Sequence, residues 1–244
     1  MDLPLLIGSE IPYAPHIALS AVPWPGAVAV WNSDEDDGYT LMKTCDARAI
    51  VGSTLSPLQA AGPGLIDRGP ALRVELMSGE LSSSLITSVL NGANTMVIGD
   101  GSSDNWEVFQ FQSAELVSDR VYDLSFRLRG QAGSDSVVPQ EWPSGSTVVL
   151  IDSAVSQISL QSGFHSILRH YRIGNASRGY EDENTTHHVL SFKGIGQRPY
   201  RVAHLNSRID QSGDCLVSWI RRTRVDGDSW DSYEVPLGEG TERY

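Results

Sequence analysis

Glycine and proline recur at short intervals along this chain, and they limit the length of any regular element. The sequence contains 23 glycines and 12 prolines among 244 residues. The stretches between them are short and rich in valine, isoleucine, leucine and aromatic residues, which suit a pleated, half-buried surface. The pattern predicts a mainly-β chain made of antiparallel β-domains, with strands joined by turns.

Three segments carry the strand pattern most clearly, and these are residues 27–31, 106–111 and 147–151. In the second segment, Trp106 and Val108 face one way, while Phe109 and Phe111 face the other. Both faces therefore carry large apolar groups. We expect this strand to be covered on both sides.

Residues 121–129 alternate in a different way. Four apolar side chains share one face, namely Tyr122, Leu124, Phe126 and Leu128. The opposite face is polar and consists of Asp123, Ser125, Arg127 and Arg129. This alternation predicts an antiparallel strand with one buried side.

Evidence for helix is thin by comparison. Residues 85–90 have mixed spacing, but the segment is short, contains β-branched residues and stops at Asn91-Gly92. We assign it to a strand or an irregular edge. Glycines that follow a small polar residue predict turns, several of them hairpins, at Asp37-Gly38, Ser78-Gly79, Asn91-Gly92, Asp100-Gly101 and Asp226-Gly227.

A domain boundary is expected in residues 194–200, where a strand-like run ends in glycines and a proline. Residues 1–198 form the larger β region, which can divide into two subdomains at a break near 55–70. Residues 199–244 are interpreted as a partial fibronectin III-like β-sandwich with Trp219 as its inward aromatic residue. Its expected strands are 203–205, 216–219 and 233–237. About a hundred residues normally complete such a sandwich, so this module is expected to be incomplete.

Charge and composition exclude several classes of function. The formal net charge is -12 and the isoelectric point is near 4.8, so the chain repels polyphosphate and nucleic acid is not an expected partner. No apolar run is long enough to span a bilayer. The first residues lack the basic region of a secretory signal, so we expect synthesis in the cytoplasm. Cys45 and Cys215 are expected to be free thiols.

Motifs for catalysis or cofactor binding are missing from the sequence. The acidic run 34–38 fails as a calcium loop, because Thr44 stands where the bidentate glutamate is required; we expect a solvated hairpin tip. His187 and His188 lie near the acidic residues 181–183, but neighbouring residues on a strand point to opposite faces. We expect these histidines to be exposed loop residues, and we predict no metal, no cofactor and no enzymatic activity. A pair of catalytic carboxylates that includes Glu107, as in glycosidases, is supported only by the abundance of carboxylates in the sequence.

Some aromatic and basic residues are candidates for contacts with partners. Most of the six tryptophans are expected in the core, but Trp142 and Trp230 sit at turn-like sites and are candidates for glycan or interface contacts. Five arginines are candidates for pairing with acidic neighbours at an interface, namely Arg127, Arg129, Arg221, Arg222 and Arg224.

From about Leu3 to Tyr244, the order of motifs resembles the C-terminal half of the large host-specificity or "megatron" protein of gene transfer agents and related siphophages. The motifs are residues 23–26 (PWPG), 67–72 (DRGPAL), 90–94 (LNGAN), 106–111 (WEVFQF), 127–133 (RLRGQAG) and 219–230 (WIRRTRVDGDSW). The segments 106–111 and 127–133 are similar to the phage tail-protein module of that family.

The resemblance implies a homotrimeric structural protein of the virion tail tip, or baseplate. It would assemble with the hub protein, the distal tail protein and a tail fibre, and it would support host recognition. The family's N-terminal region, with its TIM-barrel-like domain, has no counterpart here, so no catalytic residue is carried over. The alternative is a carbohydrate-binding module that contacts glycans of the host envelope.

Overall fold

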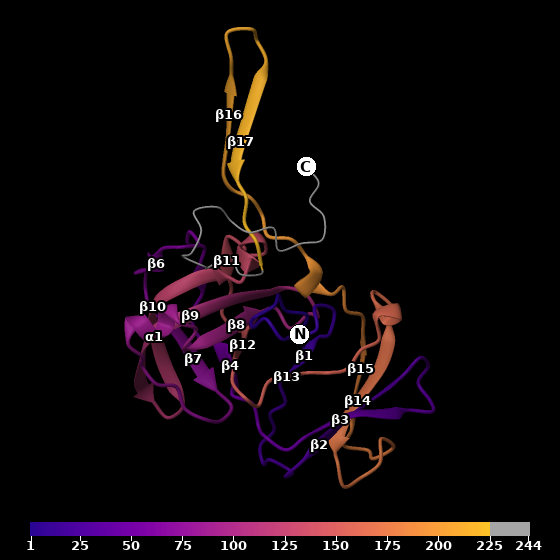
Figure 1. Cartoon of the computed structure of the whole chain (residues 1–244). Helices are drawn as coiled ribbons and strands as arrows, with labels where there is room; N and C mark the ends of the chain where they lie inside the picture. Colours follow the sequence, from indigo (N-terminus) through magenta and orange to yellow (C-terminus); the bar gives the residue numbers. More distant parts are fainter. Residues whose placement is uncertain (225–244) are drawn as a thin grey trace. The chain divides into compact units, whose positions relative to one another are not determined.

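The structure, a computed structural model, describes residues 1–224. It is mainly β with antiparallel sheets, as predicted (Figure 1). The chain divides into two compact units, Met1–Gln197 and Arg198–Tyr244, and the predicted ranges 1–198 and 199–244 differ from this division by one residue. Within the described residues, none of the helices is long and apolar enough to cross a membrane.

Six strands of the first unit close into a barrel. They are β4 (Val51–Thr54), β7 (Leu72–Leu76), β8 (Thr95–Gly99), β9 (Trp106–Ser118), β10 (Val121–Gln131) and β12 (Thr147–Leu150). Their order is β10, β7, β4, β12, β8 and β9, and a further pairing of β9 with β10 closes the ring. Closure gives each of the six strands a neighbour on both sides, which protects the backbone groups that an open sheet would leave unpaired.

The inside of the barrel is packed with apolar side chains. On β7, Leu72, Val74 and Leu76 are buried, and the two charged residues between them are exposed. This is the alternation of a strand with one side in a core. At Gly52 on β4, an added β-carbon would lie 2.2 Å from the carbonyl oxygen of Glu75, so the close approach of β4 and β7 requires glycine.

Strand β9 is buried on both faces over residues 106–111, which confirms the prediction. Its two phenylalanines belong to the core inside the barrel. Trp106 and Val108 instead pack in a second cluster with Leu3. The segment at the start of the chain thus covers part of the outer surface of the barrel.

Strand β10 follows the predicted alternation only in its first half. Tyr122 and Leu124 are buried in the barrel core, as expected. Phe126 then adopts a φ of 55° and is 38% exposed, whereas Arg127 and Arg129 are buried. A positive φ interrupts the two-residue period of a strand. The prediction that both arginines face away from the core is therefore wrong.

Residues 86–90 form a short helix, α1 (Ile86–Leu90), so the prediction of a strand or irregular edge is wrong. The side-chain nitrogen of Gln110 on β9 donates hydrogen bonds to the carbonyl oxygens of Val89 and Ala93, at 2.6 and 2.9 Å. These two bonds satisfy acceptors at the end of the helix. A residue about twenty positions away in sequence thus supports the helical turn.

A second sheet of the first unit has the order β15, β14, β2, β3. The strands are β2 (Val28–Ser33), β3 (Thr40–Cys45), β14 (Arg169–Asn175) and β15 (Thr186–Leu190). The buried β2 confirms the strand predicted at 27–31. The acidic run 34–38 is the exposed connection between β2 and β3, as predicted. His187 and His188 are exposed, but they lie on β15 and not in a loop.

Shorter elements complete the first unit: β1 (His16–Ile17), β5 (Leu58–Gln59), β6 (Ile66–Asp67), β11 (Glu141–Trp142), β13 (Ser156–Gln157), η1 (Ser134–Ser136), η2 (Ser162–Phe164) and η3 (Ile195–Gln197). Strand β6 pairs with β10 at the barrel. Residues 55–70, where a break between subdomains was predicted, contain β5 and β6.

In the second unit, β16 (Ala203–Ile209) and β17 (Cys215–Ile220) form an antiparallel hairpin. Two of the predicted strands, 203–205 and 216–219, lie within it. The third, 233–237, lies outside the described residues. Trp219, predicted to point inward in a sandwich, is 38% exposed.

Candidate functional site

A buried ion pair joins β9 and β10. Neither the Glu107 nor the Arg129 side chain has any exposed surface, and the guanidinium binds the carboxylate at two points, 2.6 and 2.8 Å. The indole nitrogen of Trp142 donates to the same carboxylate at 2.7 Å, and the backbone nitrogen of Gly130 donates at 3.1 Å. Glu107 is therefore held by four hydrogen bonds in a site closed to solvent.

The ionic group extends to Asp67 on β6. Its Oδ2 atom accepts hydrogen bonds from two nitrogens of Arg127, at 3.0 and 2.8 Å, and its Oδ1 accepts one from the backbone of Gly69 at 2.8 Å. Arg129 lies 3.7 Å from the same carboxylate. Burial opposes ionisation of Asp67, but the Gly69 amide and the Arg127 guanidinium hold its pKa below the usual value.

Three of the residues predicted to contact partners belong to this group. Trp142 is 2% exposed, Arg127 is 1% exposed and Arg129 is fully buried. The structure thus places all three inside the chain and not on its surface, where contacts with a glycan or another subunit would be made. Glu107 is equally closed to any substrate in this structure. The sequence gives no signal for the group, because its members come from four separate strands.

The other predicted contact residues lie in the second unit. Arg221, Arg222 and Arg224 are half-buried, and the Arg222 guanidinium lies 5.1 Å from the ring centre of Tyr200. Their role at an interface stays a prediction. Trp230 lies outside the described residues.

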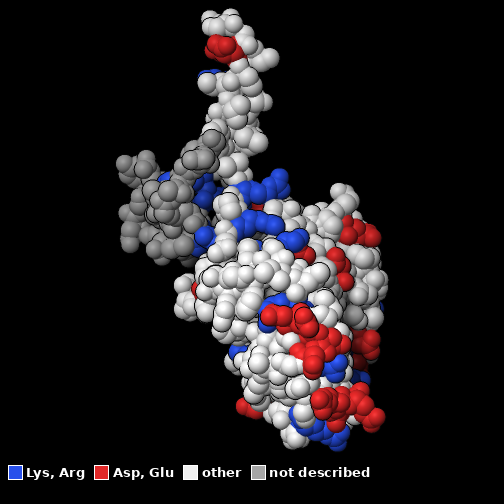
Figure 2. Space-filling model, turned by 90° about the vertical axis from the view of Figure 1, so that its right-hand side faces the viewer, with Lys and Arg blue, Asp and Glu red and all other residues white. Residues whose placement is uncertain are grey.

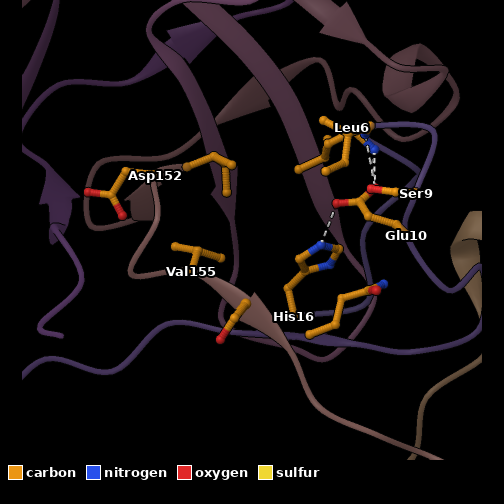
Figure 3. A pocket seen from close by; sticks show the side chains of 10 residues that line it. Leu6, Ser9, Glu10, His16, Asp152 and Val155 are labelled. Atoms are coloured by element: carbon orange, nitrogen blue, oxygen red, sulfur yellow. Dashed lines mark hydrogen bonds and ion pairs between the residues drawn. The ribbon is translucent and has the colours of Figure 1, made fainter. Parts of the chain in front are cut away.

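A surface hollow of about 420 Å³ lies between the segment at the start of the chain and β13 (Figure 3). Glu10 and His16 form its polar centre, with 2.9 Å between Oε1 and Nε2. The second oxygen of Glu10 accepts from the backbone nitrogens of Leu6 and Ile7, at 2.5 and 3.1 Å. Burial opposes ionisation of Glu10, but the bond to His16 and these two backbone bonds lower its pKa.

A carboxylate and imidazole pair activates a hydroxyl only when that hydroxyl lies within hydrogen-bond reach of the imidazole. Ser9 and Ser156 line the hollow, but within the described part of the chain neither hydroxyl bonds to His16. The Nδ1 atom of His16 is buried without a hydrogen-bond partner there. The hydrogen bonds of Glu10 thus connect the loop of residues 6–10 to His16 on β1.

One group of side chains in the described residues has the composition of a metal site. Asp36, His170 and His187 place one ligand atom each within 4.8 Å of one another. His187 was weighed as a ligand from the sequence together with His188, and the structure gives it different neighbours. Asp36 and His170 lie far from it in sequence, so no local spacing indicated the group.

Charge on the surface of the first unit is unevenly distributed. On the face shown in Figure 2, acidic side chains gather in patches and basic side chains lie beside several of them. Ion pairs of this kind join Lys193 to Asp104 at 2.6 Å and Arg178 to Asp182 at 3.0 Å. A surface with a net negative charge repels polyanions at long range.

Comparison with known families matches residues 49–149 to a family model described as Rcc01698-like, C-terminal. The matched segment contains almost all of the barrel, from β4 to β12. No curated protein matches the chain.

Proposed function

We propose that this chain is a structural component of the tail tip of a phage or gene transfer agent, where it assembles with other tail proteins and supports attachment to the host. Two kinds of similarity support the proposal. The family match covers residues 49–149, and most of the motifs that resemble the host-specificity protein lie inside that range, namely 67–72, 90–94, 106–111 and 127–133.

The observation that carries the proposal is the exposed hairpin of β16 and β17. Its register places Ile209 opposite Cys215 and Ser207 opposite Val217, so Ile209, Val217 and Trp219 share one face. These three side chains are 76, 48 and 38% exposed. Within residues 1–224 the hairpin pairs with no third strand, a two-stranded hairpin alone is marginally stable in water, and contiguous exposed apolar groups commonly mark an interface. We infer that a neighbouring subunit covers this face.

The experiment is electron cryomicroscopy of tailed particles purified from the producing cell. Density at the tail tip should fit the barrel and the hairpin with three copies around the tail axis. Absence of the chain from the particle would contradict the proposal.

Two substitutions make the test specific to the hairpin. Val217→Asp places a charge on the apolar face and should prevent incorporation into the particle, without changing the folding of the first unit. Ser212→Asp places the same charge in the exposed turn of the hairpin, away from both faces of the strands, and should be incorporated normally. Equal incorporation of both variants would show that the apolar face makes no contact.

The carbohydrate-binding alternative loses one of its two predicted aromatic residues, because Trp142 is buried. A different tryptophan, Trp24, lines an open hollow of about 570 Å³ together with polar residues that include Arg178, Asp182 and Asn184. Trp230 lies outside the described residues and stays a candidate for glycan contact, and Trp24 is a second candidate that the sequence did not single out.

A further inference from the structure

Two strands and a loop bring three potential metal ligands together at the surface of the second sheet. His170 lies on β14, His187 lies on β15, and Asp36 lies in the connection between β2 and β3. The Nδ1 atom of His170 is 3.0 Å from the Nε2 atom of His187. The same Nε2 atom is 3.8 Å from Oδ1 of Asp36.

The strand register explains why these two histidines meet. His170 pairs with Val189, and Arg172 pairs with His187, so the histidines are diagonal neighbours on one face of the sheet. Their rings lie nearly parallel, at 9° with 5.2 Å between centres. His188, the next residue along β15, points to the opposite face.

We propose that Asp36, His170 and His187 bind one divalent transition-metal ion of the zinc class, with water completing the coordination. Ligand atoms about 2.0–2.1 Å from a tetrahedral zinc ion lie roughly 3.3–3.4 Å from one another. The observed 3.0 and 3.8 Å fall on either side of that separation. Imidazole and carboxylate are ligands that zinc accepts readily.

Neighbouring side chains hold the carboxylate in position. The Tyr39 hydroxyl and the Arg172 guanidinium both donate to Oδ1 of Asp36, at 2.5 and 2.9 Å. These bonds keep the pKa of Asp36 below its usual value, and the bond from Tyr39 has the larger effect. Donors to a ligating carboxylate orient it in known metal sites, and Oδ2 makes no hydrogen bond within the described residues.

Arg172 limits the affinity of this group for a metal ion. Its positive charge lies next to the carboxylate and opposes the approach of a cation. Asp36 and His187 are 45 and 36% exposed, so an ion can reach the group from solvent. We therefore expect a moderate affinity, with the ion linking the acidic connection to β14 and β15. This inference is independent of the proposed role in a tail tip.

The test uses the full chain, purified without a histidine tag and treated with a chelator. Zinc chloride is titrated by calorimetry at pH 7.5, and cobalt(II) is titrated separately, because its visible absorption reports the coordination geometry. One zinc ion should bind per chain and raise the thermal unfolding midpoint. Loss of an outer-shell partner typically weakens metal binding about 10–100-fold, so loss of a ligand in His187→Ala or Asp36→Asn should weaken zinc binding by at least as much.

His188→Ala is the matched control, because it removes the neighbouring imidazole from the same strand. It should leave zinc binding unchanged. Thermal unfolding of each metal-free variant shows whether folding is intact. Lack of saturable binding at one ion per chain would overturn the proposal, as would equal affinity in His187→Ala and the unaltered chain. Equal losses in His187→Ala and His188→Ala would also overturn it.

Discussion

The Arg129 guanidinium lies in a site without solvent, and its stability there depends on the ion pair with Glu107. A charge loses its hydration when it is buried, and only a paired, hydrogen-bonded geometry compensates for that loss. The two contacts between the guanidinium and the carboxylate, with Trp142 as a further donor, provide this geometry. Arg129 and Glu107 are therefore each required to keep the other stable in this buried site.

Arg129→Met should lower the free energy of unfolding by about 3–5 kcal/mol, because it leaves the Glu107 carboxylate buried without its cation. Urea denaturation would measure this. Arg73→Met removes an arginine from a pair with Asp123 whose arginine side chain is 49% exposed, and it should lower the free energy of unfolding far less than Arg129→Met does, because solvent screens exposed pairs. Similar losses for the two variants would mean that burial does not govern the Arg129 pair.

Asp67 predicts a dependence of stability on pH. Its pKa is lower in the folded chain than the ordinary value, so its contribution is complete above the unfolded pKa of about 3.9. It is lost as pH falls through the lower folded pKa. Asp67→Asn should therefore make the free energy of unfolding fall less steeply below about pH 4.

The measurement is urea denaturation of both chains at a series of acidic pH values. Asp119→Asn provides the control, because the Asp119 side chain is 89% exposed beside Arg120 and exposed ion pairs contribute little to stability. If the free energy of unfolding falls equally steeply with decreasing pH in Asp67→Asn and in the unaltered chain, Asp67 does not contribute to the pH dependence of stability.

At the scale of elements, α1 depends on one residue of β9. Gln110→Met removes both donors to the carbonyl oxygens of Val89 and Ala93, and we expect it to cost about 1–3 kcal/mol. Amide hydrogen exchange should show faster exchange in residues 86–93. Gln112→Met is the control, since that side chain makes no hydrogen bond with the described residues. Unchanged protection of α1 in Gln110→Met would show that the helix does not need these bonds.

Local patterns predicted those elements whose environment is uniform along their length. Strands β2 and β12 and residues 106–111 of β9 appear where apolar and β-branched residues indicated them, because these segments are buried or half-buried throughout. The second half of β10 does not follow its own alternation, since the backbone at Phe126 changes direction. The helix α1 was missed because its partner, Gln110, is distant in sequence.

At the scale of the whole molecule, fold class was predictable and the sites were not. Turn spacing and β-forming residues sufficed for a mainly-β architecture. The pairing of β12 with β4 and β8, which completes the barrel, and the meeting of Asp36 with two histidines depend on contacts between distant segments. The burial of Arg127 and Arg129 was not predicted either, because a charged residue on an alternating strand is most simply interpreted as exposed.

The barrel starts and finishes on neighbouring strands. Val51 on β4 lies opposite Val149 on β12, and β2, which precedes the barrel, pairs with β14, which follows it. The chain thus leaves the second sheet, completes the barrel and returns near its point of departure. A gene could gain, lose or exchange the barrel at two junctions that lie close together in the fold, while the pairing of β2 with β14 is kept.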